Sequence, residues 1–184
     1  MDDMSPSRDL LEANAETIIS EFRAMETGLG DHPDNATLTP RGRWTGVHLY
    51  GVEGKNEELA AALPETTKLV EQLPLCANFG FVMFSGLEPR SHIAPHCGSS
   101  NLRQRVHLGV EVPEPDAARI RVGEDWRHWS QSKTVAFDDS FEHEVVHDGE
   151  QERIVLSVDL WHPALSEVEI RVLGDRALKS FGYA

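Results

Sequence analysis

The second half of the chain is a series of short segments with the composition and spacing of β-strands. Glycine, proline and aspartate separate them, as at Gly86, Pro89 and Asp148-Gly149. Many short strands at this spacing are typical of a β-sandwich or barrel, the jelly roll included. After Pro74, strands are predicted at 77–85, 103–112, 119–122, 134–137, 142–146 and 153–160.

The remainder of the chain predicts helices around this β-rich part. Leu10, Leu11, Ile18, Ile19 and Phe22 recur at helical spacing in the first of them. We therefore expect a mainly β domain with flanking helices, spanning 1–184 without a second domain. Helices are predicted at 9–25, at 56–72 with a break at Pro64, and at 166–181; a loop is predicted at 31–42 and a further strand at 44–52.

The charge balance limits the partners of the chain. Lys and Arg total 17 and Asp and Glu total 31, which gives a net charge of −14. Nucleic acids and anionic membrane surfaces bind cationic proteins, so neither is an expected partner. No apolar run approaches the length of a membrane span, and Cys76 and Cys97 form no CxxC pair. The expected location is the cytoplasm.

The segment 102–111 divides into two faces when it is read as a strand. Arg103, Arg105 and His107 alternate with the apolar Val106 and Leu108. The polar face has two interpretations. It faces solvent, or it lines the mouth or interior of a barrel, where small acidic ligands bind.

Three further residues are candidates for a site. Arg153 begins an apolar strand and ends the stretch 138–152, which holds no Lys or Arg. It forms either a surface ion pair or a clamp for a carboxylate, which matches the guanidinium fork. His96 and His143, two of nine histidines, lie at strand ends beside turns, where barrels present functional groups. Their number and spacing alone do not specify a metal site.

Four stretches together resemble the aspartyl/asparaginyl β-hydroxylase family. The similarity runs over about 44–169 and leaves 1–43 outside it as an N-terminal helical extension, which we expect to form part of a substrate lid. The stretches are HCG at 96–98, RQRVHLG at 103–109, FDDSFEHEV at 137–145 and DLWHP at 159–163.

This resemblance implies an Fe(II)- and 2-oxoglutarate-dependent oxygenase, which uses O₂, on a double-stranded β-helix (a jelly-roll, cupin-like barrel). It implies that His96 and His143 bind the iron, with Gly98 at the position where related oxygenases carry a carboxylate ligand. By position, Arg153 is expected to bind the distal carboxylate of 2-oxoglutarate. The remaining expected site residues are Ser85 and His107 for the cosubstrate, and Arg105 and, with weaker support, Arg103 for the substrate.

The implied reaction is hydroxylation of a C–H bond, with the β-carbon of an aspartyl- or asparaginyl-like substrate as the leading expectation. The substrate is expected to be a small or carrier-tethered acid. Two alternatives remain. Gly98 leaves space for chloride on iron, as in a halogenase, and a cupin-type barrel can bind a small ligand without catalysis.

Overall fold

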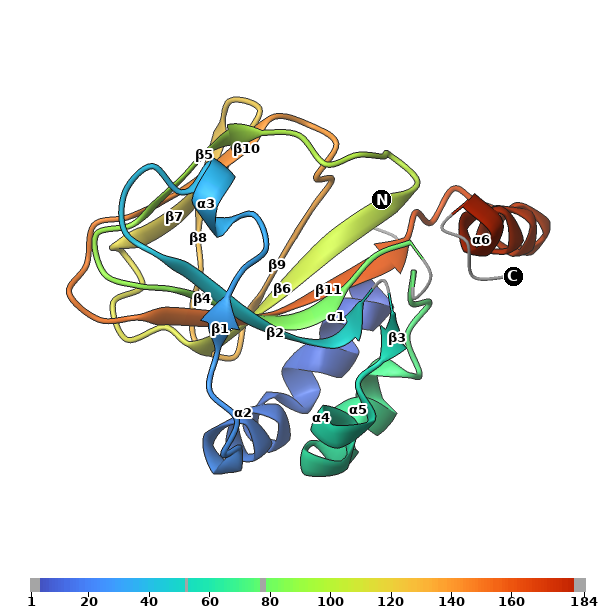
Figure 1. Cartoon of the computed structure of the whole chain (residues 1–184), viewed down its shortest axis with the longest axis horizontal. Coiled ribbons are helices and arrows are strands. Elements are labelled where there is room, and N and C mark those ends of the chain that lie inside the picture. Colours follow the sequence, from blue (N-terminus) through green and yellow to red (C-terminus); the bar gives the residue numbers. More distant parts are fainter. Residues whose placement is uncertain (1–3, 52, 77–78, 181–184) are drawn as a thin grey trace.

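Two antiparallel β-sheets face each other in the computed structural model, which describes residues 4–51, 53–76 and 79–180, with the backbone alone at 175–180 (Figure 1). The larger sheet has the order β1-β2-β4-β11-β6-β9, with β3 paired to β2. Its strands are β1 (Gly30–Asp31), β2 (Trp44–Gly51), β3 (Gly54–Lys55), β4 (Val82–Leu87), β6 (Arg103–Glu111), β9 (Thr134–Phe137) and β11 (Arg153–Trp161).

The smaller sheet has the order β5-β10-β7-β8. Following the chain from β4 to β11, the strands pass between the sheets so that β4-β11-β6-β9 face β5-β10-β7-β8, with every neighbouring pair antiparallel. This winding is that of a double-stranded β-helix, or jelly roll, and the predicted fold class is confirmed. The strands are β5 (His92–His96), β7 (Ala118–Val122), β8 (Asp125–His128) and β10 (His143–His147).

Four helices cover the outer face of the larger sheet (Figure 1). Apolar side chains of these helices, such as Leu11, Ile18 and Val70, belong to one core cluster with Val106 and Leu156 of the sheet. The burial of this face explains the apolar periodicity of the helices. They are α1 (Ser5–Ala13), α2 (Ala15–Ala24), α4 (Glu57–Ala62) and α5 (Pro64–Val70).

The predicted helix at 9–25 is in fact two helices that meet at Asn14. The backbone of Asn14 leaves the helical region, and its side-chain amide donates to the carbonyl of Leu10 at 2.8 Å. Asparagine competes for backbone hydrogen bonds in this way, and the helix therefore breaks there. The predicted break at Pro64 is confirmed.

Several short elements were not predicted. Within the predicted loop 31–42 the chain forms one helical turn, α3 (Asn35–Leu38). β8 is exposed along its whole length, so no alternation of apolar residues marks it. The predicted strand at 77–85 begins at Val82 in the structure, and residues 77–78 lie outside the described residues.

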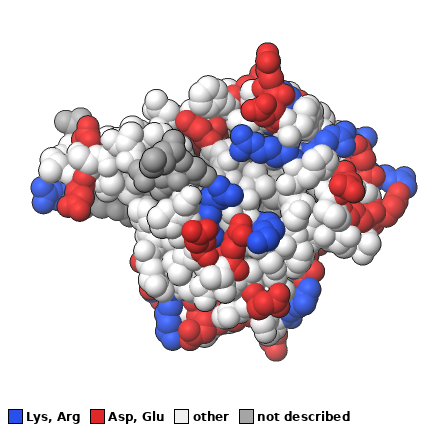
Figure 2. Space-filling view, turned by 180° about the vertical axis from the view of Figure 1, so that it is seen from behind, with Lys and Arg blue, Asp and Glu red and all other residues white. Residues whose placement is uncertain are grey.

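The last helix, α6 (Glu167–Ser180), projects away from the barrel (Figure 1). None of the helices in the described ranges is both long and apolar enough to cross a membrane. Acidic and basic side chains lie beside one another over the face shown in Figure 2. Many surface charges are ion-paired, for example Arg121 with Glu142 and Glu144, so acids beside them neutralise many of the basic residues at the surface.

The central strand β11 is buried on both faces. Ile154, Leu156 and Val158 belong to the core beneath the helices. The alternate residues Arg153 and Ser157 line a cavity between the two sheets. The barrel therefore has an apolar exterior under the helices and a partly polar interior, which holds the candidate site.

Candidate active site

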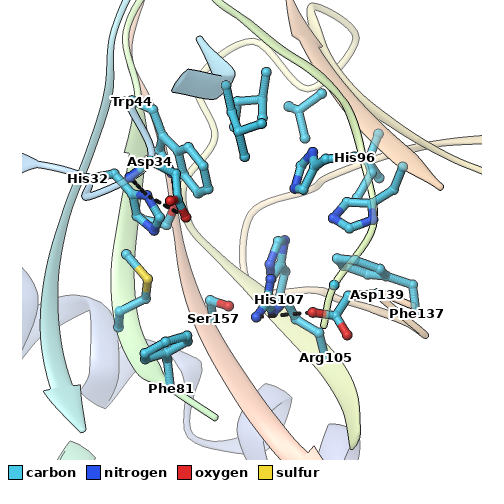
Figure 3. A pocket seen from close by; sticks show the side chains of 18 of the residues that line it. His32, Asp34, Trp44, Phe81, His96, Arg105, His107, Phe137, Asp139 and Ser157 are labelled. Atoms are coloured by element: carbon cyan, nitrogen blue, oxygen red, sulfur yellow. Dashed lines mark hydrogen bonds and ion pairs between the residues drawn. The ribbon is translucent and has the colours of Figure 1, made fainter. Parts of the chain in front are cut away.

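A cavity of about 440 Å³ lies between the two sheets and receives side chains from both (Figure 3). An apolar cluster that includes Leu87, Ile120 and Trp129 lies beside it. All the residues that the sequence singled out for a site line this cavity. They are Ser85 on β4, His96 on β5, Arg103, Arg105 and His107 on β6, His143 on β10, and Arg153 on β11.

His96 and His143 lie opposite each other at paired positions of β5 and β10. Their ring centroids are 4.2 Å apart. Nδ1 of His96 lies 2.8 Å from the carbonyl oxygen of Ala94, and Nδ1 of His143 lies 2.9 Å from that of Phe141. A carbonyl only accepts, so each Nδ1 donates a proton, and in the neutral form of each ring the lone pair is on Nε2. This is the tautomer that a metal-binding histidine needs.

The residue two positions after His96 is glycine, and a carboxylate from elsewhere occupies the adjoining space. Gly98 donates its backbone N–H to the carbonyl oxygen of Asp139 at 2.6 Å. A Cβ at Gly98 would lie 2.5 Å from Oδ2 of Asp139. Oδ1 of Asp139 is buried without a hydrogen-bond partner among the described residues. No group of three His, Cys, Asp or Glu side chains suited to a metal occurs in those residues, so the histidine pair stands alone.

Arg153 is a buried cation without a carboxylate partner in the described part of the chain. It is 2% exposed, and its guanidinium lies 4.6 Å from the centre of the Trp129 ring. Nη1 donates a long hydrogen bond of 3.4 Å to the carbonyl of Ser85, and Nε has no partner there. Burial lowers the pKa of Arg153 to about 10. A buried charge is costly when unpaired, so this environment is suited to an incoming anion.

Two neutral side chains stand beside this arginine. Oγ of Ser85 accepts a hydrogen bond from the indole of Trp44 at 2.9 Å, which leaves the serine hydroxyl able to donate. His107 packs against the rings of Trp129 and Phe137. Burial holds the pKa of His107 well below its usual value, and its Nδ1 has no described partner. Both residues offer polar atoms to a ligand in the cavity.

Arg103 and Arg105 are held by two buried aspartates. Asp159 takes Arg105 in a bidentate pair, with distances of 2.7 and 3.0 Å, and lies 3.6 Å from Nε of Arg103. Asp139 lies 3.0 Å from Arg103 and 3.3 Å from Arg105. A substrate carboxylate at Arg105 would therefore share this arginine with Asp159. Burial favours the neutral acid, but Arg105 and Arg103 outweigh it and hold the pKa of Asp159 below its usual value.

Sequence reasoning missed part of the lining. His32 and Asp34, within the predicted loop 31–42, reach the cavity, and the ring of His32 stacks on Trp44 at 3.5 Å (Figure 3). The backbone N–H of His32 donates to the carbonyl of Trp44 at 3.0 Å and fixes this segment beside β2. No spacing signal in the sequence marked these residues, since their segment is irregular.

The fold and the cavity define a jelly-roll protein with a polar site between its sheets. The family model described as aspartyl/asparaginyl beta-hydroxylase matches residues 12–163, and the chain belongs to this family. The matched region takes in residues 12–43, upstream of the stretches that carried the resemblance. The predicted family is confirmed.

Curated relatives include two hydroxylases. The human aspartyl/asparaginyl beta-hydroxylase is 34% identical over 77% of this chain and 19% of its own length. The ornithine lipid ester-linked acyl 2-hydroxylase of Rhizobium tropici is 34% identical over 85% of this chain and 55% of its own. The chain thus spans a fifth to about half of the length of these relatives. Membership of the family supports the assignment of this chain as a hydroxylase.

Solved structures with a similar fold include a predicted oxalate decarboxylase from Thermotoga maritima. It is 12% identical, with a TM-score of 0.48, and the match covers 76% of this chain and 97% of that chain.

Proposed function

We propose that the protein is an Fe(II)- and 2-oxoglutarate-dependent hydroxylase that uses O₂. One observation carries this proposal: two imidazoles, each with Nδ1 bonded to a backbone carbonyl, line the same cavity as a buried arginine that lacks a carboxylate partner among the described residues. Neutral imidazoles suit iron, and the buried guanidinium suits a carboxylate.

The residues present fit this set of ligands. His96 and His143 would hold the iron, while Arg153 and Ser85 would bind one carboxylate of 2-oxoglutarate and His107 would contact the other end. Bound there, iron with 2-oxoglutarate and O₂ supplies the oxidising chemistry that converts C–H to C–OH. The protein's own contribution is to orient the ligands and exclude water with the rings of Trp129, Phe137 and Trp44.

The substrate we propose is a small or carrier-tethered acid, hydroxylated at the β-carbon of an aspartyl- or asparaginyl-like unit. The names of the relatives support a hydroxylase, and Arg105 and Arg103 in the cavity wall support an acidic head group. Asp139 favours hydroxylation over halogenation. Its carboxylate already occupies the space beside Gly98, so a chloride at the position of the missing ligand would have to share that space.

The test is calorimetric titration under anaerobic conditions, first with Fe(II) and then with 2-oxoglutarate. We expect the wild type to bind both, and His143→Ala to lose Fe(II) affinity at least tenfold, as removal of one of two ligands requires. His128→Ala, on the exposed strand β8, is the matched control and should bind as the wild type does.

Turnover completes the test. Succinate formation from 2-oxoglutarate should require Fe(II) and increase with acidic substrates. A non-catalytic barrel would bind ligands without forming succinate. Unchanged Fe(II) affinity and unchanged 2-oxoglutarate consumption in His143→Ala would contradict the proposal.

A further inference from the structure

A second cavity, of about 670 Å³, lies directly beside the candidate active site. Three side chains, His32, Asp34 and Phe81, line both cavities. The remaining walls come from β2 and from residues 53–56 at β3. They include His48, Gly51, Gly54, Lys55 and Asn56. The two cavities are therefore neighbouring chambers with a shared wall.

A row of aromatic rings leads from the first chamber to the second. Trp44, which lines the active-site cavity, stacks on His32 with centroids 3.5 Å apart and planes 6° from parallel. His32 lies 6.2 Å from His48, which contacts Phe81 edge-on at 5.3 Å. Burial lowers the pKa of both imidazoles, that of His32 to about 3, so both are neutral near pH 7. This row of rings carries no charge.

The charged groups of the second chamber do not favour an anion. Lys55 is the cation among its described lining residues, and it already lies 3.4 Å from Glu71 and 3.7 Å from Glu57. Asp34 and Glu53 add two exposed carboxylates. An anionic group would meet net negative charge there, whereas an uncharged group would contact aromatic rings and glycine backbone.

We propose that this second chamber holds the uncharged arm of an extended substrate whose acidic head lies in the active-site cavity. The inference rests on the proposed function and deepens it. The first cavity must hold 2-oxoglutarate together with the reacting part of the substrate, and pockets of several hundred Å³ are filled by a single small ligand. Acids that bear an acyl arm are thus preferred over the free amino acid.

Gly51 offers a way to block the arm without touching the active site. A Cβ there would lie 3.7 Å from Cβ of His48, which is an ordinary contact, and the backbone is outside the left-handed region. Gly51 lines the second cavity and not the first. Gly51→Leu should therefore occupy part of the second chamber and obstruct the arm, and Gly51→Ala is the matched control with little added volume.

The probes are aspartate, N-acetyl-aspartate and N-octanoyl-aspartate, titrated calorimetrically into the protein with 2-oxoglutarate present and O₂ excluded. Burying even two methylene groups of the octanoyl arm corresponds to about tenfold in affinity. We expect the wild type and Gly51→Ala to prefer N-octanoyl-aspartate to N-acetyl-aspartate by at least about that factor. Gly51→Leu should lose this preference and keep its affinity for 2-oxoglutarate.

Each contrary outcome has a distinct meaning. Equal affinity for all three probes in the wild type, or a preference that survives in Gly51→Leu, would overturn this inference while 2-oxoglutarate still binds. If the wild type fails to bind 2-oxoglutarate, the proposed function is overturned and this inference falls with it.

Discussion

The carboxylate of Asp139 lies where a side chain at Gly98 would begin. The backbone N–H of Gly98 binds the carbonyl of Asp139 at 2.6 Å, and a Cβ at position 98 would approach Oδ2 of Asp139 to 2.5 Å. Arg103, 3.0 Å away, holds this carboxylate in place. The glycine is thus required by packing, and the site has a nearby carboxylate that comes from a different segment.

Substituting Gly98 by aspartate should therefore do more than add a metal ligand. Gly98→Asp places two carboxylates in contact and overpacks the site, so we expect stability to fall by about 1–3 kcal/mol without a gain in Fe(II) affinity. The double variant Gly98→Asp/Asp139→Gly relieves the contact and should regain stability relative to the single variant. Urea unfolding measures both. A double variant less stable than Gly98→Asp would contradict this view of the site.

Arg153→Leu should separate ligand binding from stability. Loss of the clamp is expected to weaken 2-oxoglutarate binding by about 2–5 kcal/mol, which is thirtyfold or more. The ligand-free protein should be at least as stable as the wild type, because an unpaired buried cation is removed. Calorimetry and thermal unfolding test the two effects. Arg153→Lys, which keeps the charge but loses the fork, should fall between. Unchanged 2-oxoglutarate affinity in Arg153→Leu would show that a different residue binds the carboxylate.

Asp159 should be far more important for stability than an exposed aspartate. It is 1% exposed and pairs with Arg103 and Arg105, so Asp159→Ala leaves these two cations with Asp139 as their shared carboxylate. The expected cost is about 3–5 kcal/mol. Asp148→Ala breaks exposed pairs with Arg41 and Arg119 and should cost less than about 1 kcal/mol. If urea unfolding gave the same loss of unfolding free energy for Asp159→Ala and Asp148→Ala, the buried ion pairs would contribute no more to stability than the exposed ones.

Glu12 should make the stability depend on pH. Burial favours its neutral form, but the hydroxyl and N–H of Thr134 and the ammonium of Lys133 outweigh this and lower the pKa of Glu12 to about 2. Because the folded value lies below the unfolded one, the stabilisation is complete above about pH 4.5 and is lost as the pH falls toward 2.

Glu12→Gln should accordingly lower the stability at pH 7, by about 1–2 kcal/mol because solvent screens this site near the surface. The difference from the wild type should vanish near pH 2. Chemical unfolding at a series of pH values measures this, with Glu16→Gln, an exposed carboxylate on α2, as control. A difference that stays constant from pH 7 to pH 2 would show that Glu12 does not titrate in this way.

The predictable parts of the fold are those with strong periodicity. β11 and β6 were found because apolar residues alternate along them, and β11 is buried on both sides. β8 has no buried residue and β5 contains Pro95, so neither has the pattern of a half-buried strand. Asn14 breaks a helix through a side-chain contact that residue spacing does not reveal.

The site was predictable where side chains lie on regular strands. The row Arg103, Arg105 and His107 follows from the alternation of one strand, although only the structure shows that this face points inward. The pairing of Arg105 with Asp159 joins residues on neighbouring strands, and the stacking of His32 on Trp44 depends on an irregular segment. Such contacts depend on tertiary structure, which residue order does not encode locally.

The two sheets contribute different halves of the site. His96 and His143 belong to the smaller sheet, whereas Arg153, His107 and Ser85 belong to the larger one. A single ligand bound to residues of both sheets would link the two sheets, so they could separate only after the ligand's contacts with one sheet are broken. In the fully liganded protein, the amide hydrogens of β10 and β11 should therefore exchange more slowly than in the ligand-free protein. They should also exchange at similar rates, because the two sheets would open as one cooperative unit.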